Sequence, residues 1–180
     1  MLRFPPIKPQ KLPQTLIYCS HINYGARKYR TATMFDVKTG ERCCFMTYIP
    51  AITHFSEEIR NSLYISSLNS DILNHGYGTK MLNFARKCSE KEGCRGNIHL
   101  SADWTLSPGR IPHIFYRKYG MNTGDKKMDK KLDKFIKSKK VATYKDFPQT
   151  PMYYPPMKYP KTKFFNKLKD IFFTQKRILL

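Results

Sequence analysis

A strand pattern leads into a glycine-containing turn and then into a helical pattern near the middle of this chain, and this succession restricts the fold. Residues 63–68 (LYISSL) predict a strand, and the turn after it reads His75-Gly76-Tyr77-Gly78-Thr79-Lys80. An apolar stripe with helical spacing follows, formed by Met81, Phe84, Ala85 and Cys88. Residues 97–102 predict the next strand and 112–119 a short helix. This strand–helix–strand–helix order requires at least one parallel crossover in a sheet.

Strand patterns on both sides of this unit extend the predicted sheet. Residues 29–37 and 42–49 are rich in β-branched and aromatic side chains, and the turn sequence KTGE between them predicts a hairpin. Short strands are also expected at 15–18 and 150–155. We therefore expect an α/β (α+β) fold with a mixed central sheet, because the hairpin is antiparallel and the crossover is parallel.

The glycine turn departs from two familiar phosphate-binding motifs. A dinucleotide fingerprint has the form G-x-G-x-x-G, but Met81 occupies the third glycine position. A Walker loop has the form G-x-x-x-x-G-K-[ST], and Lys80 does not follow a glycine in that register. Backbone N–H groups at a helix N-terminus can nevertheless hold a pyrophosphate. From the turn alone, this interpretation and an unliganded strand-to-helix turn are equal alternatives.

The charge of the chain restricts its partners. It has 33 Lys and Arg residues against 13 Asp and Glu residues, which gives a formal net charge of +20. Such a field attracts nucleic acid, an anionic membrane surface or a phosphorylated cofactor. The five cysteines lack a C-x-x-C spacing, so neither a metal site nor a disulfide framework is predicted. A signal peptide pattern and a bilayer-spanning apolar run are both lacking, so we expect a cytoplasmic protein.

A second motif, HIFYRKYGM at residues 113–121, lies about forty residues after the glycine turn. Together with Gly76-x-Gly78 and the strand between them, it resembles the GCN5-related N-acetyltransferase (GNAT) family. That family combines a Q/R-x-x-G-x-G/A turn and its helix with a later helix that carries F/L-Y-x-K-x-G-F. Leu73 replaces the family's Gln or Arg, and Met121 replaces its last Phe. The resemblance implies a GNAT-like mixed sheet, mostly antiparallel with one splayed parallel pair, and helices on both faces.

The resemblance also implies an activity, in which a primary amine attacks the thioester of acetyl-coenzyme A and takes its acetyl group. The expected cofactor contacts are Leu68, Asn69, Ser70, His75, Gly76, Tyr77, Gly78, Thr79 and Lys80. Tyr116 matches the family's tyrosine, whose hydroxyl can act as a general acid toward the departing thiolate. Glu57, Glu58 and Asp103 are the candidate bases for the amine. No metal is expected.

Three regions are expected along the chain. Residues 1–14 form a proline-rich extended arm, 15–156 an N-acetyltransferase-like domain with a Lys-rich surface helix at 125–140, and 157–180 a basic amphipathic helix. That last helix either docks on its own domain or on a second copy in a homodimer, or lies on an anionic membrane. The alternative function is a basic RNA- or ribosome-binding module without catalysis. The class of the acceptor amine is left open.

Overall fold

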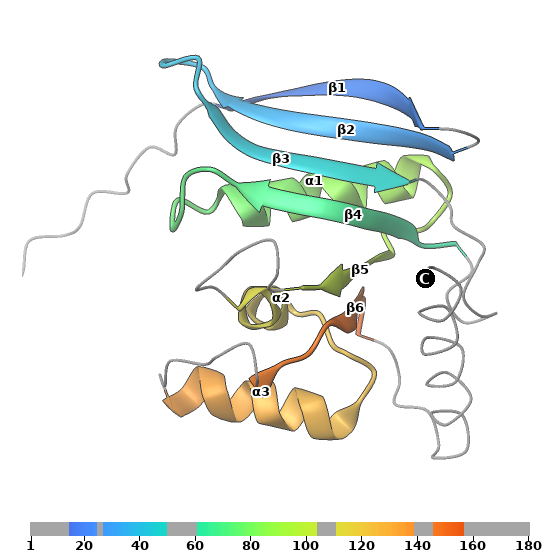
Figure 1. Ribbon diagram of the computed structural model, residues 1–180. Coiled ribbons are helices and arrows are strands. Elements are labelled where there is room, and N and C mark those ends of the chain that lie inside the picture. Colours follow the sequence, from blue (N-terminus) through green and yellow to red (C-terminus); the bar gives the residue numbers. More distant parts are fainter. Residues whose placement is uncertain (1–14, 25–26, 50–60, 104–110, 139–145, 157–180) are drawn as a thin grey trace, which may run out of the picture.

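The computed structural model describes residues 15–24, 27–49, 61–103, 111–138 and 146–156 of the chain. In these residues the order of elements is β1–β2–β3–β4–α1–β5–α2–α3–β6 (Figure 1). The strands are β1 (Thr15–Tyr24), β2 (Arg27–Asp36), β3 (Arg42–Ile49), β4 (Leu63–Ser70), β5 (Ile98–Ala102) and β6 (Thr150–Tyr154). The helices are α1 (Tyr77–Lys91), α2 (Pro112–Tyr119) and α3 (Lys126–Ser138).

The six strands form one sheet in sequence order, from β1 at one edge to β6 at the other. Neighbouring strands run antiparallel except β4 and β5, which are parallel and are connected through α1. The expected fold class, a mixed sheet that is mostly antiparallel with one parallel pair, is therefore confirmed. So is the hairpin of β2 and β3. This is the sheet that the resemblance to the GNAT family implies.

The largest difference from the predicted elements concerns β1, which extends to Tyr24 rather than ending near Tyr18. Residues 19–24 (CSHINY) are mostly polar, so their composition hides a strand that exists because it pairs with β2 along its whole length. The other predicted elements agree with the structure to within a few residues at each end. The expected arm at 1–14 and the helix at 157–180 lie outside the described residues.

The core lies between the sheet and α1, which runs behind β3 and β4 in Figure 1. Met46 on β3 and Leu63 on β4 face Met81 and Leu82 of α1, and all four side chains are fully buried. Met81 belongs to the apolar stripe that the sequence predicts, and Leu82 is its neighbour in the sequence. Burial of that stripe provides most of the stability of such a helix.

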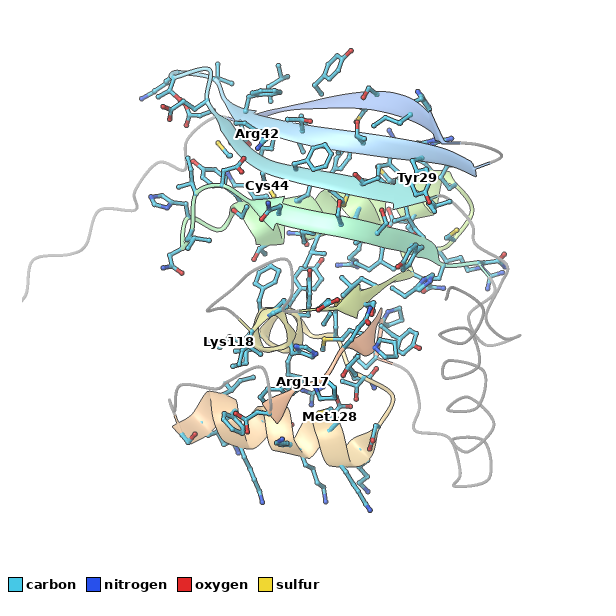
Figure 2. The ribbon with its side chains drawn as sticks, in the orientation of Figure 1. Tyr29, Arg42, Cys44, Arg117, Lys118 and Met128 are labelled. Atoms are coloured by element: carbon cyan, nitrogen blue, oxygen red, sulfur yellow. The ribbon has the colours of Figure 1, made fainter. Side chains whose placement is uncertain are left out.

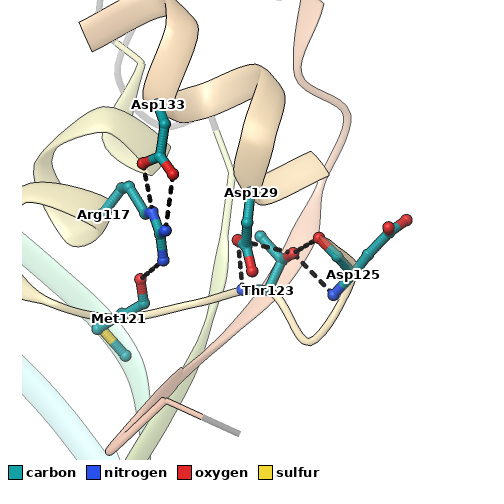
Figure 3. Close-up of polar contacts among 6 residues, drawn as sticks. All are labelled: Arg117, Met121, Thr123, Asp125, Asp129 and Asp133. Atoms are coloured by element: carbon teal, nitrogen blue, oxygen red, sulfur yellow. Dashed lines mark hydrogen bonds and ion pairs between the residues drawn. The ribbon is translucent and has the colours of Figure 1, made fainter. Parts of the chain in front are cut away.

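The helices α2 and α3 pack against each other through polar contacts as well as apolar ones (Figure 3). Arg117 on α2 donates two hydrogen bonds to the carboxylate of Asp133 on α3, at 2.8 and 2.9 Å, and a third to the Met121 carbonyl at 3.1 Å. At the start of α3, the Asp125 carboxylate accepts the N–H of Lys127 at 2.8 Å, as an N-cap residue does. These bonds anchor α3, and hence α2, at the β6 end of the molecule.

Candidate active site

The parallel strands β4 and β5 separate toward their carboxyl ends. Their pairing ends at Ile65 on β4 and Leu100 on β5, whereas β4 continues to Ser70. Beyond that point the backbone groups that face the gap have no cross-strand partner in the described sheet. In an α/β sheet, ligands commonly bind at the carboxyl ends of parallel strands that part in this way.

A β-bulge in β4 accompanies the separation. Tyr48 on β3 pairs with Ile65 on β4, but Thr47 pairs with Ser67, so Ser66 is an extra residue without a β3 partner. A bulge bends its strand and increases the local twist. Because the bulge follows directly on the last β4–β5 pair, it accounts for the change of direction that takes the rest of β4 away from β5.

A small open hollow with a cavity volume of about 60 Å³ lies where the strands part. Both strands and α2 line it. The lining residues are Ile65, Ser66, Ser67, Leu68, Leu100, Ser101, Asp103, Pro112 and Tyr116. Of the cofactor contacts expected on β4, Leu68 is in this lining, while Asn69 and Ser70 continue the strand beyond it. Ser66 and Ser67, which the sequence does not predict as contacts, also line the hollow, next to the bulge.

Tyr116 projects from α2 into the lining of the hollow, and only 7% of the residue is exposed. Its ring packs against Phe115, with the ring centroids 5.2 Å apart. Burial raises the pKa of its hydroxyl above the ordinary value of a tyrosine, because the anionic form would lose its hydration. The hydroxyl is therefore protonated at neutral pH, as a proton donor must be.

Asp103 lines the same hollow, directly after β5, so the structure brings two of the predicted catalytic residues together. A carboxylate can accept a proton and a protonated tyrosine hydroxyl can donate one, and both residues line this small space. Glu57 and Glu58, the other candidate bases, lie outside the described residues.

His113, one turn before Tyr116 on α2, is completely buried and serves to position the helix. Its Nε2 lies 2.9 Å from the carbonyl oxygen of Pro148, and since a carbonyl only accepts, Nε2 carries the hydrogen. Burial lowers the pKa of this histidine, which keeps it neutral. The bond ties α2 to the chain that leads into β6, and so supports the placement of Tyr116.

The glycine turn forms the start of α1. Gly76 is the N-cap residue, with a φ of 75° in the left-handed region that favours glycine, and no neighbouring atom lies within 4 Å of the place where a Cβ would be. No side chain caps this end of α1, and the first intrahelical bond of the turn is donated by Lys80 to the Gly76 carbonyl. The N–H groups of Gly78 and Thr79 thus lie at a helix N-terminus that has no side-chain cap, where the helix dipole favours an anion.

Gly78 has a packing role that the sequence could not reveal. A Cβ at this position would lie 3.0 Å from Cζ of Phe115, closer than ordinary van der Waals contact. The absence of a side chain at Gly78 therefore allows the Phe115 ring on α2 to pack on the first turn of α1. Phe115 contacts this turn, and its neighbour Tyr116 lines the hollow, so this aromatic pair connects the start of α1 with the hollow.

The remaining residues of the turn differ in exposure. Tyr77 is buried in the core, whereas His75 and Thr79 are exposed. The Lys80 ammonium lies 5.6 Å from the centre of the Tyr77 ring, which keeps a positive charge beside the helix N-terminus. Of the residues expected to hold a pyrophosphate, the structure therefore offers backbone N–H groups and one ammonium rather than the side chain of Tyr77.

Within the described residues, no group of three or more His, Cys, Asp or Glu side chains is placed to hold a metal ion. No helix in the same part of the chain has both the length and the apolar character needed to cross a membrane.

The chain was also compared with known proteins. No family model and no curated protein matches its sequence. Among solved structures, an acyl-CoA N-acyltransferase from Pseudomonas aeruginosa matches 68% of this chain and 67% of its own, with 17% identity and a TM-score of 0.39. A structure described as a bacterial toxin matches 79% of this chain and 90% of its own, with 14% identity and a TM-score of 0.44. At these identities and TM-scores, neither similarity bears on what this chain binds or does.

Proposed function

We propose that this protein is an acyl-CoA-dependent N-acetyltransferase that moves the acetyl group of acetyl-coenzyme A to a primary amine. The observation that carries the proposal is the hollow between the parting strands β4 and β5, into which α2 brings the buried, protonated hydroxyl of Tyr116. The backbone N–H and C=O groups of β4 beyond Ile65, which have no partner on β5, suit the amides of a pantetheine arm. The uncapped start of α1 suits a pyrophosphate.

Each residue of the hollow has a role in this reaction. As the amine nitrogen bonds to the acetyl carbon, the carbon–sulfur bond breaks and its electron pair goes to sulfur. The Tyr116 hydroxyl donates its proton to that sulfur, and solvent returns a proton to the tyrosine. Asp103 accepts the proton that the amine loses, directly or through a water molecule. The backbone N–H groups of Gly78 and Thr79 would hold phosphate oxygens.

Two measurements test this proposal. Acetyl-coenzyme A at millimolar concentration should raise the melting temperature, and a panel of primary amines should reveal one class that releases free thiol. Tyr116→Phe keeps the ring and removes the donor, so kcat should fall by roughly 10²-fold or more while the cofactor still raises the melting temperature. A protein that is not stabilised by the cofactor and releases no thiol with any amine would refute the proposal.

The lysines of α3 favour a second candidate function, the binding of a nucleic acid. The exposed lysines on this helix are Lys126, Lys127, Lys130, Lys131, Lys134 and Lys137, and Figure 2 shows the row of nitrogen-tipped side chains along the outer side of α3. The helix also contains two acidic residues with their own partners: Asp133 is paired with Arg117, and the buried Asp129 accepts two hydrogen bonds from Thr123. The exposed side of the helix therefore carries an excess of positive charge over about 16 Å.

The other side of α3 distinguishes a nucleic acid from a membrane. Leu132 is fully buried, and Met128 and Phe135 pack against the core. An amphipathic helix that lies on a membrane must insert its apolar side into the lipid, and here that side is occupied. Lysines that contact phosphates as point charges, without reading bases, agree better with this geometry.

The salt dependence of RNA binding tests this second function. The triple variant Lys126→Gln, Lys130→Gln, Lys134→Gln should reduce the slope of log K against log[salt] by about 2 for a single strand, since each lost phosphate contact removes about 0.7. The variant Lys38→Gln, Lys87→Gln, Lys91→Gln changes the net charge equally at exposed positions elsewhere and should leave most of the slope. Equal slopes in the two variants would show that α3 is not the binding face.

A further inference from the structure

The strand β1 forms one edge of the sheet, and it lacks the features that usually protect an edge. Its sequence, TLIYCSHINY, contains no proline and no charged residue, in a chain of which 26% is charged. Three of its apolar side chains are largely exposed: Leu16 by 62%, Tyr18 by 63% and Ile22 by 48%. Natural proteins block such edges with lysine, proline or bulges, because an open edge pairs with further strands. An unprotected edge of ten residues is thus an interaction surface.

The edge has a defined pattern of outward-facing backbone groups. Tyr24 pairs with Arg27, and two residues separate them in the sequence. In a hairpin with a two-residue connection, the pair that flanks the connection is a hydrogen-bonded pair. In an antiparallel ladder such pairs alternate, so the even-numbered residues of β1 bond to β2. The N–H and C=O groups of the odd-numbered residues therefore point away from the sheet, where Ile17, Cys19 and His21 occupy the middle of the strand.

The chain's own terminal segments are poor partners for this edge. Residues 1–14 contain four prolines, each of which lacks the N–H group that a ladder needs. Residues 157–180 have apolar side chains at helical rather than alternating spacing. A second copy of β1, by contrast, offers the same uncharged, alternating edge, and antiparallel pairing about a two-fold axis satisfies both copies equally.

We propose that two copies of this protein associate through β1, in antiparallel register, to form one continuous sheet across a two-fold axis. Outward-facing groups can only pair with outward-facing groups, so odd-numbered residues oppose odd-numbered residues. The register that pairs all five odd-numbered residues of β1 places Cys19 of one copy opposite Cys19 of the other, with Ile17 opposite His21 and Thr15 opposite Asn23. The dimer does not depend on the acetyltransferase activity.

The distribution of charge agrees with this arrangement. The lysine face of α3 lies at the end of the molecule opposite β1 (Figure 1), so a two-fold axis at β1 places the two lysine faces as far apart as possible. Their separation by the width of two sheets exceeds the Debye length of about 8 Å at physiological salt, and their repulsion is screened. Nearer to β1, the Arg30 guanidinium is neutralised by its ion pair with Glu92.

The position of Cys19 provides a direct test. A hydrogen-bonded antiparallel pair has Cα atoms about 5.5 Å apart, which is within the range that a disulfide spans. Mild oxidation of the purified protein should therefore give a covalent dimer, and Cys19→Ser should abolish it. Cys19 is exposed, whereas Cys43, Cys44 and Cys94 are buried. Cys88 is partly buried and accepts a hydrogen bond from the Tyr48 hydroxyl, so Cys88→Ser serves as the control and should leave the cross-link intact. A monomer after oxidation, or a dimer that persists in Cys19→Ser, would overturn the proposed register.

Sedimentation equilibrium under reducing conditions tests the association itself. Cys19→Lys puts two ammonium groups directly opposite each other and should raise the dimer dissociation constant at least about fivefold, while Cys19→Ser should leave it nearly unchanged. Leu73→Lys adds the same charge at another exposed apolar position, 41% exposed, and should also leave it unchanged. A wild-type protein that is monomeric at all concentrations would refute the proposal, and so would a Cys19→Lys variant that dimerises as well as the wild type.

Discussion

The contact between Gly78 and the Phe115 ring predicts that packing requires a glycine at this position. Alanine adds a methyl group that lies 3.0 Å from Cζ of Phe115, and 3.5 and 3.6 Å from two further ring atoms. Because Phe115 also packs on Tyr116, the ring has little room to move away. Overpacking of this kind costs about 1–3 kcal/mol. The gain in helix propensity from Gly to Ala, at most about 1 kcal/mol, opposes it. Gly78→Ala should therefore lower the free energy of unfolding by between about 0 and 3 kcal/mol.

A double-mutant cycle with Phe115→Leu separates the two terms. Leucine removes the ring atoms that the methyl group would meet, so in that background Gly78→Ala should be neutral or stabilising by up to about 1 kcal/mol. The expected coupling is about 1–3 kcal/mol, measured as the difference between the urea-derived effects of Gly78→Ala in the two backgrounds. Thr79→Ala, at an exposed position on the same turn, should have the same effect in both backgrounds. If the coupling of Gly78 with Phe115 is below about 0.5 kcal/mol, the packing explanation is wrong.

Three further predictions follow from buried side chains. Burial raises the pKa of Tyr116, so the stability that its neutral form provides is present below the unfolded pKa of about 10 and is lost as the pH rises through the folded pKa. Tyr116→Phe should therefore flatten the fall in the free energy of unfolding above about pH 10. Burial lowers the pKa of His99 to about 4, so the free energy of unfolding should fall by up to about 3 kcal/mol as the pH decreases from about 6.5 to 4. In urea titrations, His99→Phe should remove most of that fall. Leu132→Ala should lower the free energy of unfolding by about 2–5 kcal/mol, because Leu132 is the fully buried attachment of α3; a loss below 1 kcal/mol would mean that α3 is not held by this contact.

The sequence predicts the sheet and most of its elements because their signals are local. The turn KTGE between two β-rich segments indicates the hairpin, and the stripe at Met81, Ala85 and Cys88 indicates α1. β1 was predicted too short because its second half is polar, and pairing with β2 rather than composition makes it a strand. Tyr116 was expected to lie at the site from the resemblance, and it lines the hollow.

The parts of the site that sequence reasoning missed depend on contacts between distant segments. Ser66 lines the hollow because of a bulge that arises from the register of β4 on β3, and nothing in LYISSL indicates that register. Gly76 and Gly78 appear equivalent in the motif, yet the first is required by a left-handed φ and the second by the ring of Phe115. A glycine in a sequence pattern therefore does not show whether backbone conformation or packing requires it.

The helix α2 shows how the fold determines the direction of the proposed acid. Three consecutive residues of this helix have three different neighbours: Phe115 rests on the start of α1, Tyr116 enters the hollow, and Arg117 is bonded to Asp133 on α3. Because consecutive helical residues point about 100° apart, contacts on both sides of Tyr116 leave the helix little freedom to rotate about its axis. The orientation of the Tyr116 hydroxyl is thus determined by α1 and α3 together, and loosening either neighbour should lower the rate of transfer more than it weakens binding of the cofactor.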